Sequence, residues 1–146
     1  MKKLAAILLS LMFVFALCAC NNSDSSTTES SEPEGVVGKW TMESFESKTS
    51  IPEDQIDASI ELNDDNTFTF TQEYTGGSEP MKMVVTGTYT YSEGDLEFTS
   101  KHATAYQGSK SQELNEADDF TGKLKDDKLT ITNPKSEPHE YVMKRA

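Results

Sequence analysis

The sequence predicts an all-β fold, an eight-stranded antiparallel up-and-down β-barrel formed by residues 36–146. Three observations lead to this prediction. From Val36 onward the apolar residues recur with a period of two, which is typical of strands that bury one face. The connections between these segments are alternately short and long. Eight such strands in a row would leave two exposed edges as a flat sheet, and closure into a barrel removes both edges.

Each expected strand has its inward side chains at every second position. The strands are expected at residues 36–45, 58–62, 67–75, 81–91, 95–106, 119–125, around Leu129 and Ile131, and at 139–145. The inward residues of the first four are Gly38, Trp40 and Met42; Ile60 and Leu62; Phe68 and Phe70; and Met81, Met83, Val85, Gly87, Tyr89 and Tyr91. Those of the last four are Leu96, Phe98, Ser100, His102, Thr104 and Tyr106; Phe120, Gly122 and Leu124; Leu129 and Ile131; and Tyr141, Met143 and Arg145.

The connections predict two different ends of the barrel. Asp64-Asp65-Asn66, Glu93-Gly94 and Asp126-Asp127 are typical of tight turns. The connections at about 46–57 and 107–118 are longer, and the first has room for one short helical turn that begins at Pro52. Because alternate connections of a meander lie at the same end, we expect one closed end and one open mouth.

The first 19 residues have the features of a secretory signal peptide. Two lysines precede an apolar stretch at residues 4–17, which is shorter than the ~20 residues needed to cross a bilayer. The stretch ends in Leu17-Cys18-Ala19-Cys20, which resembles the lipobox of bacterial lipoproteins. The resemblance implies that Cys20 is lipidated and becomes the first residue of the mature chain. Two acyl chains are enough for stable attachment to a lipid bilayer.

A tether is expected between the lipidated cysteine and the barrel. Residues 21–35 contain Asn, Ser, Thr, acidic residues, one Pro and one Gly, with no large apolar side chain. Such a segment buries too little surface to offset its ordering entropy. The predicted organisation is therefore a signal peptide at 1–19, a lipidated tether at 20–35 and a barrel domain at 36–146. We expect the protein to be lipid-anchored on the extracytoplasmic face of the cell membrane.

The composition argues against several classes of function. The chain has 13 basic and 25 acidic residues, a net charge of −12, so it lacks the basic surface that nucleic-acid binding requires. Its only cysteines, Cys18 and Cys20, precede the barrel, so the body has no cysteine for a disulfide or a catalytic thiol. His102 and His139 lack partners at metal-ligand spacing, and no catalytic or phosphate-binding motif occurs. We expect a non-enzymatic protein with no metal and no cofactor.

One motif resembles a known family. Gly38-Lys39-Trp40 at the start of the first expected strand matches the Gly-x-Trp motif of lipocalins and their calycin relatives. Residues 36–145 are similar to the small lipocalin-like domains of bacterial lipoproteins, through residues 64–70, Gly87-Thr88-Tyr89 and residues 127–131. The resemblance implies that Gly38 and Trp40 lie at the closed end of the barrel. It also implies that a basic residue of the last strand, Arg145 or alternatively Lys144, lies over the Trp40 ring.

The expected interior changes from apolar at the base to mixed polar and aromatic at the mouth. An interior lined by apolar side chains with a few polar groups is typical of small-molecule sites. An eight-stranded barrel has room either for its own side chains or for one small ligand. The candidate ligand-binding residues are Met42, Gln72, Tyr74, Met81, Met83, Ser100, His102, Tyr106 and Tyr141.

Two hypotheses for the function follow, and neither names the ligand or a partner protein. The leading hypothesis is a membrane-anchored lipoprotein that binds a small, partly apolar ligand at the open end of the barrel. The alternative is a non-enzymatic envelope interaction or structural module with a filled core. Such a module would contact another protein through its loops, which are acidic at Glu113, Glu116, Asp118 and Asp119. We interpret this acidic group as a solvated surface, with a surface calcium site as the other interpretation. In either case we expect a monomer.

Overall fold

The computed structural model describes residues 35–47, 51–115, 117–133 and 139–146, so the expected signal peptide, Cys20 and residues 20–34 of the tether lie outside it. The described residues form nine strands and one short 3-10 helix. These elements are β1 (Gly38–Ser47), η1 (Glu53–Gln55), β2 (Ile56–Leu62), β3 (Thr67–Tyr74), β4 (Met81–Ser92), β5 (Asp95–Gln107), β6 (Lys110–Leu114), β7 (Phe120–Lys125), β8 (Lys128–Asn133) and β9 (His139–Arg145). Within these residues, no helix has the length and hydropathy needed to cross a membrane.

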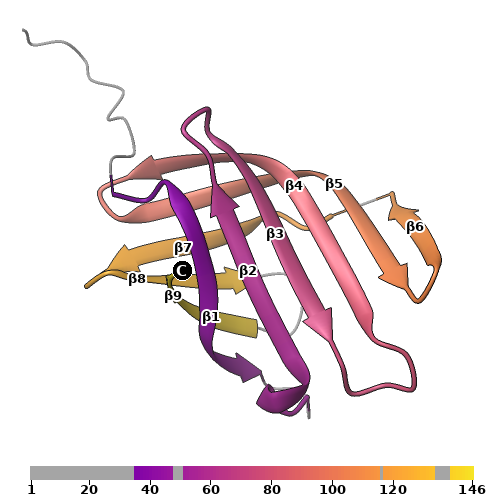
Figure 1. Cartoon of the computed structure of the whole chain (residues 1–146). Coiled ribbons are helices and arrows are strands. Elements are labelled where there is room, and N and C mark those ends of the chain that lie inside the picture. The colour runs from indigo at the N-terminus through magenta and orange to yellow at the C-terminus, as the bar shows by residue number, and fades with distance from the viewer. Residues whose placement is uncertain (1–34, 48–50, 116, 134–138) are drawn as a thin grey trace, which may run out of the picture. The chain divides into compact units, whose positions relative to one another are not determined.

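The strands form one antiparallel sheet that closes on itself (Figure 1). The order is β4-β3-β2-β1-β9-β8-β7-β5-β6, and the pairing of β4 with β5 completes a barrel of eight strands. Around this barrel each strand is antiparallel to both of its neighbours, and β1 pairs with β9. The prediction of an eight-stranded up-and-down barrel is therefore confirmed.

The ninth strand, β6, was not predicted. It lies in the segment 107–118, which we expected to be a long loop, and it pairs with β5 from Ala103↔Leu114 to Gln107↔Lys110. The first part of β5 pairs on the same edge with β7, up to Phe98↔Phe120. Figure 1 shows β6 beside the far end of β5, beyond the barrel strands. The loop prediction was wrong because every residue of β6 is exposed, so the strand has no buried face and no alternation of apolar residues.

Tight turns close one end of the barrel. Glu93 and Gly94 connect β4 to β5, and Asp126 and Asp127 connect β7 to β8. All four have positive φ angles, between 52° and 93°. Positive φ at both central positions matches the right-handed twist of the flanking strands. The third turn, between β2 and β3, also contains a residue of positive φ, Asn66 at 61°.

The closed end is a filled apolar core around Trp40. The Trp40 ring is fully buried, and its Nε1 donates a hydrogen bond of 2.9 Å to the carbonyl oxygen of Val36. The guanidinium carbon of Arg145 lies 4.6 Å from the centre of the ring. The same guanidinium donates hydrogen bonds to the carbonyl oxygens of Val37 and Gly35. This is the arrangement that the family resemblance implies, with Arg145 rather than Lys144 over the ring.

Aromatic rings fill the interior of the base of the barrel. Phe68 and Phe98 meet edge to face with their centroids 5.2 Å apart, and Phe98 stacks on Phe120 at 4.5 Å. Phe68 and Phe98 are only 1% exposed. The hydroxyl of Tyr89 donates a hydrogen bond to the Asn63 carbonyl oxygen, which fixes the ring against the β2–β3 turn. The base of the barrel therefore has its interior occupied by side chains.

Two β-bulges separate the base from the open end. In β5, Gly87↔Ser100 is followed by Thr86↔His102, so Lys101 is an extra residue that has no partner in β4. In β1, Met42↔Met143 is followed by Ser44↔Val142, so Glu43 is the extra residue. An extra residue bends the strand and changes which positions of it face the interior. Beyond the bulges Ala103 and Phe45 become buried.

Gly87 makes the β5 bulge possible. A Cβ atom at this position would lie 2.0 Å from the carbonyl oxygen of Thr99 and 2.8 Å from the Phe68 ring. No side chain fits at that distance, so glycine is required for the close approach of β4 to β5. Glycine inside a strand is a recognised sign of a bulge or of a close backbone approach.

Candidate functional site

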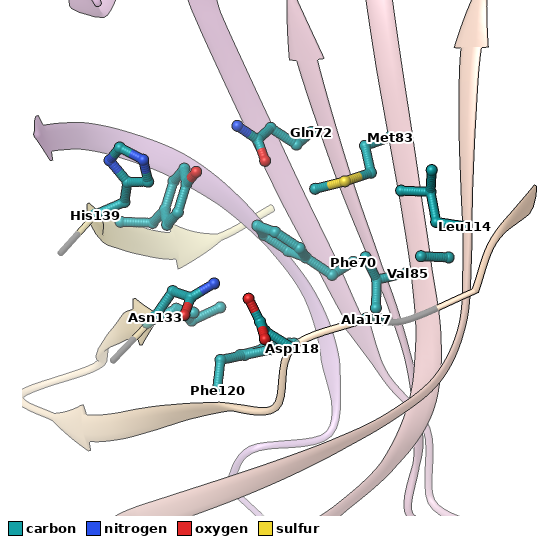
Figure 2. A pocket seen from close by; sticks show the side chains of 13 residues that line it. Phe70, Gln72, Met83, Val85, Leu114, Ala117, Asp118, Phe120, Asn133 and His139 are labelled. Carbon is teal, nitrogen blue, oxygen red and sulfur yellow. The ribbon is translucent and has the colours of Figure 1, made fainter. Parts of the chain in front are cut away.

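A cavity of about 380 Å³ lies at the end of the barrel that has the long connections. Its volume is near the lower end of the range for small-molecule sites, roughly 300–1,000 Å³. Residues from β3 to β9 line it together with the connection between β6 and β7 (Figure 2). The lining consists of Phe70, Gln72, Met83, Val85, Ala103, Leu114, Ala117, Asp118, Phe120, Ile131, Asn133, His139 and Tyr141.

The floor of the cavity is aromatic and is continuous with the core. Phe70 lies 5.6 Å from Phe120 and 5.5 Å from Tyr141 between ring centroids. Phe45, beyond the β1 bulge, packs on Tyr141 at 4.9 Å and supports that ring from behind the lining. These contacts hold the aromatic faces in place without a ligand. The floor is therefore preformed, which lowers the cost of binding.

Small side chains on β5 leave the space open. Below the bulge, β5 contributes Leu96 and Phe98 to the interior, whereas above the bulge it contributes Ala103, which lines the cavity. Ala103 occupies much less of the interior than Phe98 does on the same strand, and the difference is close to the volume of a phenyl ring. The cavity therefore arises from the sequence of β5.

The lining also contains polar side chains. Figure 2 shows the amide of Asn133, from β8, beside the carboxylate of Asp118, while His139, from β9, and Gln72, from β3, lie farther from that carboxylate. The Nδ1 of His139 lies 2.8 Å from the Ser47 hydroxyl, which orients the imidazole. A lining of this kind combines apolar contact with a few hydrogen-bonding groups.

The hydroxyl of Tyr141 belongs to the same cavity. The residue is 4% exposed, and this burial raises the pKa of its phenol to about 12. Burial disfavours the charged phenolate because the low-dielectric interior solvates charge poorly. The phenol is therefore neutral across the physiological range and is available as a hydrogen-bond donor.

Three of the nine predicted ligand-binding residues line the cavity. Gln72 on β3, Met83 on β4 and Tyr141 on β9 converge on it from three strands. Their inward positions follow from simple alternation. The pairing of β3 with β4 has no extra residue near Gln72 or Met83, and β9 pairs regularly with β8 from Met143 to Tyr141.

The expected inward position of His102 and Tyr106 was wrong. His102 is exposed, Tyr106 is 41% exposed, and neither lines the cavity. The reason is the extra residue Lys101, which changes the parity of β5 so that Ala103 points inward. Tyr106 instead lies on the outer face, in a shallow groove with Lys82 and Val84.

The other four candidates lie outside the cavity lining. Met42 is partly buried and packs against the core, opposite Met143. Tyr74 lies at the end of β3, and Met81, which is 47% exposed, lies at the start of β4. Ser100 lies at the β5 bulge, where its hydroxyl donates a hydrogen bond to the Asp118 carbonyl oxygen.

Several lining residues were not among the candidates. Asn133 and His139 have the same parity as Ile131 and Tyr141, so the alternation of β8 and β9 could have identified them. Ala103 could have been found from Gly87, which signals the bulge. Nothing in the local pattern identifies Leu114, Ala117 and Asp118, because their wall depends on the unpredicted strand β6.

The expected acidic group does not assemble into a metal site in the described part of the chain. No three His, Cys, Asp or Glu residues there are grouped so that they could hold a metal ion. Asp118 lines the cavity, whereas Asp119 accepts a hydrogen bond of 2.9 Å from the Ser100 amide. Glu113 is exposed on β6, and Glu116 lies outside the described residues.

Comparison with known proteins supports the architecture. A family model described as a lipocalin-like domain matches residues 36–118, which is more than half of the chain. The match begins at the first buried residue of the barrel, Val36, and ends at Asp118 in the cavity wall. No curated protein and no solved structure matches the chain significantly.

Proposed function

Because this chain belongs to the lipocalin-like domain family and its barrel contains a cavity at the open end, we propose that it binds a small, partly apolar ligand there. The observation that supports this most is the contrast within one interior. The base is filled with side chains, whereas about 380 Å³ remains free above Phe70 and Phe120. We propose a non-enzymatic binding role, as is general for this family.

The cavity gives less support to the alternative of a filled interaction module. A barrel that only presents its loops to a partner protein needs no free interior volume. Packed interiors have few voids larger than a water molecule. An open, preformed space with an aromatic floor and several polar side chains is the expected form of a ligand site.

Native mass spectrometry of the protein purified gently from its host is the first test. We expect a reproducible extra mass that is lost on denaturation, and its value would give the class of the ligand. Ala103→Phe, which fills the cavity, should abolish this mass. Thr104→Phe is the matched control, because it adds the same ring to the neighbouring residue of β5, which lies outside the cavity lining.

The proposal fails if the protein carries no bound molecule and also takes up none from a mixture of lipids and metabolites. It also fails if Ala103→Phe and Thr104→Phe reduce binding equally, because the bound molecule would then lie elsewhere. Both variants are first checked for a cooperative unfolding transition, so that loss of folding is not mistaken for loss of binding.

We also propose that the chain is a lipoprotein attached to the membrane through acylated Cys20. The support is the lipobox-like sequence Leu17-Cys18-Ala19-Cys20 after an apolar stretch of signal-peptide length. Cys20→Ala should release the protein from membranes or leave it as an unprocessed precursor. Cys18→Ala is the control and should leave lipidation unchanged. Normal mature lipidation of Cys20→Ala would contradict the proposal.

A further inference from the structure

We infer that the ligand is a small organic cation with an apolar body, an alkylamine or arylalkylamine, whose ammonium group binds beside the carboxylate of Asp118. This inference rests on the proposed ligand-binding function and specifies its substrate class. It follows from the charges of the lining, from the way Asp118 is held, and from the aromatic floor.

The fixed charge of the described lining residues is negative. Asp118 is the only acidic residue among the described residues that line the cavity, and no lysine or arginine is among them. Among the described residues, the other titratable groups of the lining are His139 and the Tyr141 phenol. The chain has a net charge of −12. A negative protein surface attracts cations and repels anions, so an amine is favoured over a carboxylate of the same shape.

The backbone that carries Asp118 is fixed to β5. The Ser100 hydroxyl donates a hydrogen bond of 2.8 Å to the carbonyl oxygen of Asp118, and the Ser100 amide donates one of 2.9 Å to the carboxylate of Asp119. These two bonds attach the connection between β6 and β7 to the bulge of β5. Asp118 is thereby held at the rim by its main chain, which leaves its side chain available.

The carboxylate of Asp118 has no protein partner in the described part of the chain. The structure shows no hydrogen bond or ion pair to its side-chain oxygens from those residues. Figure 2 shows these oxygens directed into the space between Phe70 and Asn133. Because no described residue forms an ion pair with Asp118, a cation that binds there has no such pair to displace. Ammonium and carboxylate groups form charge-assisted hydrogen bonds, which are stronger than neutral ones.

The aromatic floor suits the rest of such a ligand. Phe70, Phe120 and Tyr141 surround the space on the side opposite the rim, and all three are under 8% exposed. An apolar body would pack on these rings, while a cation near their faces is attracted by the π-electrons. Asn133 and His139 add polar surface to the same lining. One site therefore provides contact for both halves of an amphipathic amine.

Three probes of similar size test the inference on the full chain. They are 2-phenylethylamine, which is cationic, 2-phenylethanol, which is neutral, and phenylacetate, which is anionic. Binding is followed by backbone amide shifts in NMR spectra. We expect the amine to bind about two- to fivefold more tightly than the alcohol, as for an exposed ion pair, and the acid to bind most weakly. The preference should decrease at high salt.

Asp118→Asn separates charge from shape. It should lower the affinity for the amine to that for the alcohol and leave the alcohol unchanged. Asp54→Asn is the matched control, because Asp54 is an exposed aspartate of η1 outside the cavity lining, and it should change neither affinity.

The inference is overturned if the alcohol or the acid binds as tightly as the amine, or if Asp118→Asn leaves the amine affinity unchanged. Binding of the alcohol without any preference for the amine overturns the inference alone. Absence of binding by all three probes, together with a bare mass for the protein from its host, overturns the proposed function as well.

Discussion

The base and the mouth of this barrel differ in how their interiors are occupied, although the same strands build both. At the base, Trp40, Phe68 and Phe98 are almost completely buried and fill the space between the strands. At the mouth, Ala103 and several half-exposed polar residues leave about 380 Å³ free. Side-chain size, and not the number of strands, therefore decides whether a part of this barrel is core or cavity.

The stability and the proposed function of the protein are accordingly assigned to different halves. Burial of large apolar side chains is the main favourable contribution to folding, and it is concentrated at the base. The mouth contributes less to the free energy of folding, because its open interior buries fewer large apolar side chains. Substitutions at the base are therefore expected to change stability, and substitutions at the mouth are expected to change binding.

The largest expected effect is at the base. Trp40→Ala should lower the free energy of unfolding by about 3–5 kcal/mol, because it removes a fully buried ring from the core. Gln72→Ala, at the mouth, should lower it by less than about 1 kcal/mol because the side chain is only partly buried. Chemical denaturation measures both values. Equal losses would contradict the division between base and mouth.

The next effect concerns the boundary between the two halves. Gly87→Ala should lower the free energy of unfolding by about 1–3 kcal/mol, because its Cβ would lie 2.0 Å from the Thr99 carbonyl oxygen. Gly77→Ala is the control, since the nearest atom to its Cβ would be 3.4 Å away. Thermal unfolding of both variants tests this. A Gly87→Ala variant as stable as the control would show that the bulge relaxes without cost.

A smaller effect is expected for the cation at the closed end. Arg145→Met keeps an apolar stem but removes the charge over Trp40 and the hydrogen bonds to the carbonyl oxygens of Val37 and Gly35, and we expect a loss of about 1–2 kcal/mol. Lys144→Met removes the same charge from the neighbouring position and should have less effect. Chemical denaturation at low and high salt compares the two. A larger loss of stability for Lys144→Met than for Arg145→Met would contradict the stabilising role of the Arg145–Trp40 contact.

The smallest effect at neutral pH involves Tyr141 at the mouth. Its pKa is raised to about 12 by burial, whereas an unfolded tyrosine has a pKa near 10. The neutral phenol is thus favoured in the folded state, so this contribution to stability is complete below pH 10 and is lost as the pH rises from about 10 to 12. It does not change near pH 7.

The absorbance of tyrosinate measures this titration. The difference between the titration curves of the wild type and Tyr141→Phe isolates the one phenol, and we expect its midpoint well above those of exposed tyrosines. A midpoint near 10 would mean that water reaches the Tyr141 hydroxyl freely and that the cavity is more open than its geometry indicates.

Most of the base could be predicted from the sequence. There, strict alternation in β2, β3 and β4 gives the correct inward residues, and the turn residues give the correct closed end. The Gly-x-Trp motif and Arg145 meet as the family resemblance implies. This half is predictable because a period of two persists wherever the hydrogen-bonded ladder is regular.

Less of the mouth could be predicted, because alternation fails after an extra residue. Lys101 changes the parity of β5, so His102 and Tyr106 were expected to face inward although both are exposed. Glu43 is a similar extra residue in β1. The wall formed by Leu114 and Asp118 was missed for a different reason. It depends on an exposed edge strand whose pairing is set by its tertiary neighbour β5 rather than by its own pattern.

The bulge at Lys101 has a consequence for how this barrel can be redesigned. Lys101 is one residue more than the ladder between β4 and β5 needs. Its deletion would leave Phe98 and Ala103 on the same face, because they would then be an even number of positions apart. Only the local bend of the strand would change. The bend of the strand and the side chains of the cavity are therefore encoded separately: deletion of Lys101 would alter the bend, whereas substitutions such as Ala103→Phe would alter the free volume and the chemistry of the lining.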